Sequence, residues 1–173
     1  MIQIYTGEGK GKTTAAMGLA LRACGAKKRV AVLQFMKKGD SSEIKTIKKY
    51  KLPIDTFAYG LGFYKILGDK HTDAEHKKAL GQGLKKANKI IQSEQYDLII
   101  LDEINVAINL GLLNIDDVIA MIKTQHQTPT VDIILTGRHA HPELIKIADL
   151  VTEMNPIKHY FKKNVAARKG IEF

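Results

Sequence analysis

The chain has 173 residues, one cysteine and no tryptophan, and its 27 lysine and arginine residues against 18 aspartate and glutamate residues give a formal net charge of +9. This length fits one domain that buries roughly 70% of the surface its unfolded chain exposes, and a single cysteine excludes an intramolecular disulfide. The basic charge suits an anionic ligand, an acidic protein partner or nucleic acid, and does not choose among them.

No segment predicts export or membrane insertion. Met1 leads directly into IQIYTG, without the basic stretch and apolar core of a secretory signal. Apolar runs such as Leu98–Leu101 are far shorter than the about 20 residues that span a bilayer. Neither a CxxC pair nor an HExxH motif is present to hold zinc. We therefore expect a soluble, cytoplasmic protein with no membrane partner.

Apolar segments of strand length alternate with longer helical patterns along the chain. In chain order, the pattern predicts a strand at Ile2–Thr6, a helix at Gly11–Cys24, a strand at Arg29–Phe35, a helix at Ser42–Tyr50, a strand at Pro53–Ala58, a helix at Asp73–Glu94, a strand at Tyr96–Glu103, a helix at Asn114–Thr124, a strand at Thr130–Gly137, a helix at Pro142–Ala148 and a strand at Leu150–Met154. Such alternation predicts an α/β protein whose mostly parallel sheet is covered by helices on both faces. Because no repeat or linker-like stretch interrupts it, we expect a single domain over residues 1–173.

A glycine-rich loop follows the first predicted strand. Its sequence TGEGKGKT ends in the GK[ST] of a phosphate-binding loop, and the predicted helix behind it presents its positive end to the same place. In the usual GxxxxGK[ST] pattern the first glycine would fall at Thr6, and two glycines inside the loop supply the flexibility instead. We expect Lys12 to contact phosphate and the Thr13 hydroxyl to bind Mg²⁺. The predicted nucleotide-binding residues of this loop are Gly7, Glu8, Gly9, Lys10, Gly11, Lys12, Thr13 and Thr14.

Polar residues also end the later predicted strands, at the sheet edge where ligands bind in folds of this kind. The strand YDLIILDE ends in Asp102 and Glu103. A pair of carboxylates in this position is typical of groups that hold Mg²⁺ and orient a reacting group. Arg138 ends the next strand and is predicted to stabilise phosphate charge. We therefore predict Lys12 and Glu103 as catalytic residues, and Thr13, Asp102 and Glu103 as metal ligands. The alternative for Asp102 and Glu103 is a solvated carboxylate pair in a turn, and the alternative for Arg138 is a surface ion pair.

The sequence leaves the role of several other polar residues open. The second strand ends in QFMKKG, which offers Gln34, Lys37 and Lys38, and each of them suits ligand contact or solvent equally well. Histidines 71, 76, 126, 139 and 141 are predicted to be surface or cap residues rather than metal ligands. These residues together predict a magnesium–nucleotide site, but they identify no acceptor.

Several motifs taken together resemble the P-loop-type corrinoid adenosyltransferases, which act on cob(I)alamin or cob(I)yrinic acid a,c-diamide. The motifs are GEGKGKTTAAMGLALRACG, VLQFMKKG, LGF, LIILDE, TGR and ADLVTEMNPIKHYFKKNVAARKGIEF. The resemblance covers nearly the whole chain and implies a RecA-like P-loop NTPase fold and a homodimer. It also implies transfer of the 5′-deoxyadenosyl group of ATP to the Co(I) centre of cobalamin, cobinamide or cobyrinic acid a,c-diamide, with release of triphosphate.

The same resemblance implies the second substrate site and the partners. Phe63 matches the phenylalanine that displaces the lower axial ligand of the corrinoid, and Tyr64 is the candidate for a second aromatic residue. Lys65 stands where a related member commonly carries tryptophan. The implied cofactors are ATP with Mg²⁺, or Mn²⁺ in its place, with the corrinoid as substrate. An acidic flavodoxin or ferredoxin is the implied electron donor.

Two other function classes remain as alternatives. A P-loop nucleoside kinase or ATPase would use the same loop and carboxylates, and it would release ADP or phosphate. A nucleic-acid-binding module would use the lysine-rich helices, but no aromatic stacking platform or nucleic-acid motif accompanies them. We therefore expect adenosyl transfer and no nucleic-acid partner.

Overall fold

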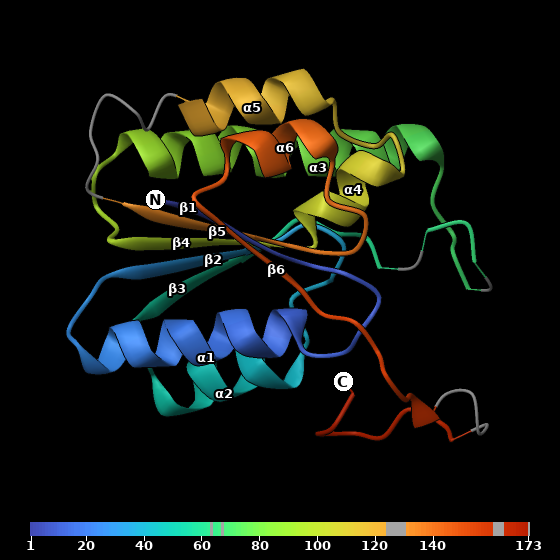
Figure 1. The fold of residues 1–173 in the computed structure, drawn as a ribbon, viewed down its shortest axis with the longest axis horizontal. Helices are drawn as coiled ribbons and strands as arrows, with labels where there is room; N and C mark the ends of the chain where they lie inside the picture. The colour runs from blue at the N-terminus through green and yellow to red at the C-terminus, as the bar shows by residue number, and fades with distance from the viewer. Residues whose placement is uncertain (63, 67, 124–130, 161–164, 173) are drawn as a thin grey trace.

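The computed structural model describes residues 1–62, 64–66, 68–123, 131–160 and 165–172. Its strands form one sheet in the order β3-β2-β4-β5-β1-β6. They are β1 (Ile2–Thr6), β2 (Val30–Gln34), β3 (Ile54–Ala58), β4 (Leu98–Asp102), β5 (Asp132–Thr136) and β6 (Leu150–Glu153). All neighbouring strands are parallel, which confirms the predicted parallel sheet and brings the carboxyl ends of the strands to one edge (Figure 1).

Helices cover both faces of the sheet, as the sequence predicts. They are α1 (Lys12–Gly25), α2 (Ser42–Tyr50), α3 (Asp73–Gln92), α4 (Ile104–Asn109), α5 (Ile115–Lys123) and α6 (Pro142–Ile147). Figure 1 shows α1 and α2 on one face and α3, α5 and α6 on the other. Within the described ranges, no helix combines the length and the apolar composition that crossing a bilayer requires.

The hydrophobic core lies in two layers, one on each face of the sheet. In β2, Ala31 and Leu33 belong to the layer under α3 and α5, whereas Val30 and Val32 belong to the layer under α1 and α2. Successive side chains of a strand point to opposite faces. A strand that is buried on both faces is therefore apolar over most of its length, which is why the central strands β2, β4 and β5 contain continuous apolar runs in the sequence.

Local signals in the sequence explain where the longest helix begins. Thr72 is the N-cap of α3, and it forms a capping box with Glu75, in which each side chain accepts a hydrogen bond from the backbone of the other. One face of α3 packs in the core, because Leu80, Ala87 and Ile91 recur at helical spacing and are buried, and Leu84 on the same face is partly buried. α3 begins at the edge of the sheet where the strands have their carboxyl ends, directly after the long loop that connects β3 to α3 (Figure 1).

Candidate nucleotide-binding site

The segment between β1 and α1 forms a loop that closes against the end of β6. Gly7 and Gly11 have φ values of +93° and +117°, a conformation that only glycine adopts without steric cost. Gly9 donates its backbone N–H to the carbonyl oxygen of Met154 at 2.6 Å, and a Cβ on Gly9 would lie 2.6 Å from that same oxygen. Glycine is therefore required inside this loop. Thr6 is the last residue of β1, and its φ is not positive.

Lys12 lies inside the loop and is 9% exposed. Its Nζ donates to the carbonyl oxygens of Gly7 and Gly9, each at 2.7 Å. Burial is the main reason why the pKa of Lys12 is lowered, and the charge of Arg138 lowers it further. An ammonium held by two carbonyls of the loop is in a suitable position for phosphate oxygens that the loop would surround.

A cluster of hydrogen bonds converges on Asp102, the last residue of β4, whose side chain is 0% exposed. Its Oδ1 accepts from the hydroxyls of Thr13 at 2.9 Å and Thr136 at 2.8 Å. Its Oδ2 accepts from Lys37 Nζ at 2.8 Å and Gln34 Nε2 at 3.2 Å. The structure thus brings Asp102 and Thr13 together, and it shows that two of the residues left open by the sequence belong to the same cluster.

The ammonium of Lys37 lies between Thr13 and Asp102, where it donates to both side chains. Burial acts to lower the pKa of Lys37, but the charge of Asp102, the hydrogen bond to Asp102 and the charge of Glu103 together outweigh it, and the pKa is raised. A cation is therefore favoured between these two side chains, both of which carry the hard oxygen donors that Mg²⁺ prefers. On this observation, the residues present fit a divalent cation held jointly with nucleotide phosphates.

Glu103 follows Asp102 directly and begins α4 in the left-handed conformation, with φ at +63°. Its backbone N–H donates to the hydroxyl of Thr136 at 3.0 Å. Burial, followed by the charge of Asp102, raises the pKa of Glu103. Within the described part of the chain, no hydrogen bond or ion pair occupies its carboxylate, which can therefore serve a metal ion or a reacting group.

Arg138 approaches the phosphate loop from the end of β5. Its Nη1 lies 3.4 Å from Glu8 Oε2, and His139 Nε2 lies 3.4 Å from Glu8 Oε1. The three side chains are about half exposed, so they can rearrange around a bound anion. Thr14 is exposed in the first turn of α1. The structure thus places Arg138 and the predicted loop residues at the same edge of the sheet.

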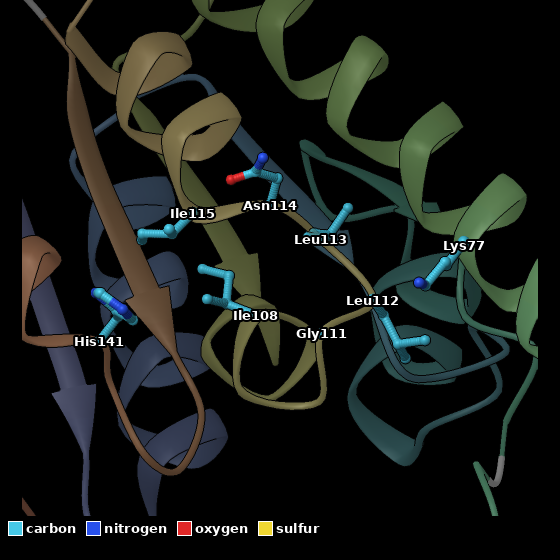
Figure 2. A pocket seen from close by; sticks show the side chains of 8 residues that line it. All are labelled: Lys77, Ile108, Gly111, Leu112, Leu113, Asn114, Ile115 and His141. Atoms are coloured by element: carbon cyan, nitrogen blue, oxygen red, sulfur yellow. The ribbon is translucent and has the colours of Figure 1, made fainter.

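Two cavities open near this edge. One of about 450 Å³ borders the phosphate loop and is lined by Gly9, Lys10 and residues 154–160. The other, of about 470 Å³, is shown in Figure 2. Its lining residues come from α3, α4, the connection to α5, the first residue of α5 and the residue before α6, and they include Lys77, Asn114 and His141. None of the predicted site residues lines this second cavity.

The predicted corrinoid residues lie in the loop between β3 and α3. Phe63 lies outside the described residues. Tyr64 is partly buried against the core, and its ring meets that of His76 edge to face, with centroids 5.1 Å apart. Lys65 Nζ lies 2.9 Å from an oxygen of Asp73 and 5.1 Å from the Tyr64 ring centroid. In this structure Tyr64 therefore packs on α3, and its contact with a corrinoid stays a prediction.

The prediction for His76 was wrong, because this side chain is 2% exposed rather than on the surface. It is buried because its ring packs against the rings of Tyr64 and His71 and its Nε2 lies 3.2 Å from Asp69 Oδ1. His141 is a cap residue as predicted, since its Nδ1 accepts from the backbone N–H at position 143. His71 and His139 are exposed as predicted, and position 126 lies outside the described residues.

The conformation of the β3–α3 loop is expected to be acid-sensitive through Asp69. Hydrogen bonds from the backbone N–H groups of His71 and Lys65 lower the pKa of Asp69 to about 2. Because this folded-state pKa lies below the ordinary value of 3.8, the carboxylate stabilises the fold above about pH 4, and this contribution is lost as the pH falls through 2. Urea unfolding at pH 6 and pH 2.5 should therefore show a smaller acid-induced loss in Asp69→Asn than in the parent. Equal losses in the two proteins would contradict this assignment.

Two features missed by sequence reasoning belong to this site. The first is α4, which places Glu103 at a helix start. The second is Asn105 in α4, which is 0% exposed and whose side-chain amide has no hydrogen-bond partner among the described residues. A buried asparagine in an apolar run carries no sequence signal that separates it from a solvated turn residue.

The parallel sheet, the glycine loop with its enclosed lysine, and the carboxylates at the end of β4 define an α/β protein of the RecA-like P-loop class. In agreement, the fold is similar to that of the flagellar accessory protein FlaH from Methanocaldococcus jannaschii, with a TM-score of 0.55 over 88% of this chain and 69% of that chain. The sequence identity is 16%, so this likeness concerns the fold alone.

The sequence profile of the family described as ATP:corrinoid adenosyltransferase BtuR/CobO/CobP matches residues 1–173. The corrinoid adenosyltransferase of Pseudomonas aeruginosa is 34% identical over 174 residues, which is all of this chain and 83% of the relative. The corrinoid adenosyltransferase of Escherichia coli K12 is 30% identical, again over all of this chain and 85% of the relative. The chain therefore belongs to the ATP:corrinoid adenosyltransferase family, which confirms the resemblance found in its motifs.

Proposed function

We propose that this chain transfers the 5′-deoxyadenosyl group of ATP to the Co(I) centre of a corrinoid and releases inorganic triphosphate. The observation that supports this most directly is the loop that encloses Lys12 beside the cluster of Thr13 and Asp102. Family membership over residues 1–173 supports the acceptor. The alternative of a nucleoside kinase or ATPase shares the loop but receives no support from the relatives.

In the proposed reaction, the electron pair of Co(I) forms a bond to C5′ of ATP. The bond from C5′ to its phosphate oxygen breaks, and triphosphate leaves with the electron pair of that broken bond. Because Co(I) is the nucleophile, the protein needs no activated serine or cysteine, and its task is to stabilise charge on the leaving group. We assign this task to Lys12 and Arg138.

The proposed metal is Mg²⁺, or Mn²⁺ in its place. Thr13, Asp102 and Glu103 would hold it together with phosphate oxygens and water. When bound, the metal would neutralise part of the charge that develops on triphosphate. Lys37 would then have to leave its position between Thr13 and Asp102, because the metal and the ammonium are both cations that favour the same oxygens.

Further proposals concern the second substrate and the setting of the enzyme. We propose that Phe63 and Tyr64 contact the lower face of the corrinoid, and that the chain acts as a single domain within a homodimer in the cytoplasm. The formal charge of +9 supports an acidic electron donor such as a flavodoxin or ferredoxin. We propose neither a nucleic acid nor a membrane as a partner.

Anaerobic incubation of the protein with Mg-ATP and chemically reduced cob(I)alamin tests the proposal. The expected result is the visible spectrum of an alkyl-cobalt product that is lost on illumination, together with one triphosphate per product. An unchanged corrinoid spectrum with accumulation of ADP and phosphate would reject adenosyl transfer and favour a phosphoryl-transfer enzyme. Protein with cob(I)alamin but no ATP is the control for non-enzymatic spectral change.

A further inference from the structure

The outer side of the phosphate loop contacts a part of the chain that is 150 or more positions away. Lys10, which lies between two glycines of the loop, donates from Nζ to the hydroxyl of Tyr160 at 3.1 Å. The same Nζ donates to Glu172 Oε1 at 2.9 Å, across 162 sequence positions. Unlike Lys12, which is bound inside the loop, Lys10 is therefore held from outside by the segment 165–172 and by Tyr160.

Glu172 is fixed by several donors. Arg168 donates to it from the backbone N–H at 2.6 Å, from Nε at 3.3 Å and from Nη2 at 3.2 Å. The hydroxyl of Tyr160 donates to the same carboxylate oxygen that accepts from Lys10. The side chain of Glu172 is 16% exposed, against 40% for Lys10. Arg168, followed by Tyr160, holds the pKa of Glu172 well below its usual range, so the carboxylate stays charged.

The group formed by Lys10, Arg168 and Glu172 keeps a net positive charge, since one carboxylate is shared by two cations. Both cations also lie near the Tyr160 ring, with Lys10 Nζ 5.8 Å and Arg168 Cζ 5.2 Å from its centroid. Glu172 therefore does not cancel the attraction of this region for an anion. It keeps the Lys10 ammonium in one place.

The position of Lys10 affects the entropic cost of ordering the loop. The neighbours of Lys10, at positions 9 and 11, are glycines, which lose much conformational freedom when a ligand orders them. A side chain that is held before the anion arrives lowers this ordering cost. We propose that Glu172 is a positioning residue for the triphosphate of ATP, acting through Lys10 to hold the outer side of the phosphate loop. This inference rests on the proposed function, because it assumes triphosphate in that loop.

The test is a double-mutant cycle on the binding of inorganic triphosphate with Mg²⁺, measured by titration calorimetry. Glu172→Gln is expected to weaken binding about fivefold, the size of effect typical of one charged hydrogen bond at a partly exposed site. Lys10→Met is expected to weaken it at least as much. The double variant is expected to bind as Lys10→Met does, because Glu172 acts only through Lys10. A purely structural role of Glu172 would instead give losses that multiply.

Two further variants sharpen the result. Tyr160→Phe removes the hydroxyl that Lys10 and Glu172 share, and it should weaken triphosphate binding about twofold, again only while Lys10 is present. Asp97→Asn is the matched control, since Asp97 accepts from the backbone N–H and guanidinium of Arg29 as Glu172 does from Arg168. Asp97 precedes β4 at the opposite edge of the sheet, so this variant should bind triphosphate as the parent does.

The outcomes separate this inference from the proposed function. If the parent binds triphosphate and Glu172→Gln binds it equally well, or if the losses in the double variant multiply, the positioning role is overturned and the proposed function stands. If the parent does not bind triphosphate at all, both are overturned. Thermal unfolding of each ligand-free variant by circular dichroism shows that the compared proteins are folded.

Discussion

Replacement of Lys12 by methionine is expected to lower kcat/KM for adenosyl transfer by about 10²- to 10³-fold, the loss typical of removing one donor that stabilises transition-state charge. The ammonium is held by the carbonyls of Gly7 and Gly9 inside the loop, where triphosphate would gain its charge. Methionine keeps the length and apolar volume of the side chain. Since burial lowers the pKa of Lys12, removal of its charge should leave the melting temperature nearly unchanged.

Steady-state kinetics with saturating cob(I)alamin and varied Mg-ATP measures this effect. Lys89→Met is the matched control, because it removes one exposed lysine from the last turn of α3, away from the loop, and should keep parental kinetics. A loss below about threefold in Lys12→Met would contradict the assignment of Lys12 to the leaving group.

Asp102→Asn is expected to have the second large effect, on both metal dependence and stability. The carboxylate accepts four hydrogen bonds, and asparagine would turn an NH₂ group toward some of these donors while leaving the Lys37 ammonium without its counter-charge. Because the side chain is 0% exposed, we expect a loss of about 3 kcal/mol in the free energy of unfolding. The Mg²⁺ concentration for half-maximal activity should rise at least about tenfold.

Urea unfolding and a magnesium titration of activity test the two parts separately. Asp97→Asn changes the same residue type just before the amino-terminal end of the same strand and should leave the magnesium titration unchanged. An Asp102→Asn protein with parental magnesium dependence would show that the carboxylate has a purely structural role.

Much of the fold was predictable because its central strands β2, β4 and β5 are buried on both faces and its helices on one. The apolar positions of α3 recur at helical spacing, and the helix predicted to begin at Asn114 begins directly after it, at Ile115, with Asn114 Oδ1 accepting from the backbone N–H of Asp116. α4 was not predictable, because its six residues are too few for a helical period and Ile104, Ala107 and Ile108 are all buried. A short helix of this kind looks like a continuation of the preceding strand.

The site was predictable where its residues lie at or just after strand ends, as Asp102 and Arg138 do, and where a glycine-rich motif marks them, as it marks Lys12. The role of Lys37 within the Asp102 cluster was not, because two lysines in a row at a strand end give no sign of which one turns inward. The contact between Lys10 and Glu172 is also invisible to local patterns, since it joins positions 162 apart. Such contacts depend on how the end of β6 leads the chain back past the loop.

The central claim is that the phosphate loop holds a leaving group rather than a phosphoryl group in transfer. An anaerobic single turnover with cob(I)alamin and ATP that carries a radioactive γ-phosphorus tests it most directly. The account predicts that all of the consumed label appears in inorganic triphosphate, in a one-to-one ratio with alkyl-cobalt product. Label in orthophosphate or on another acceptor, with ADP as the remaining nucleotide, would contradict it.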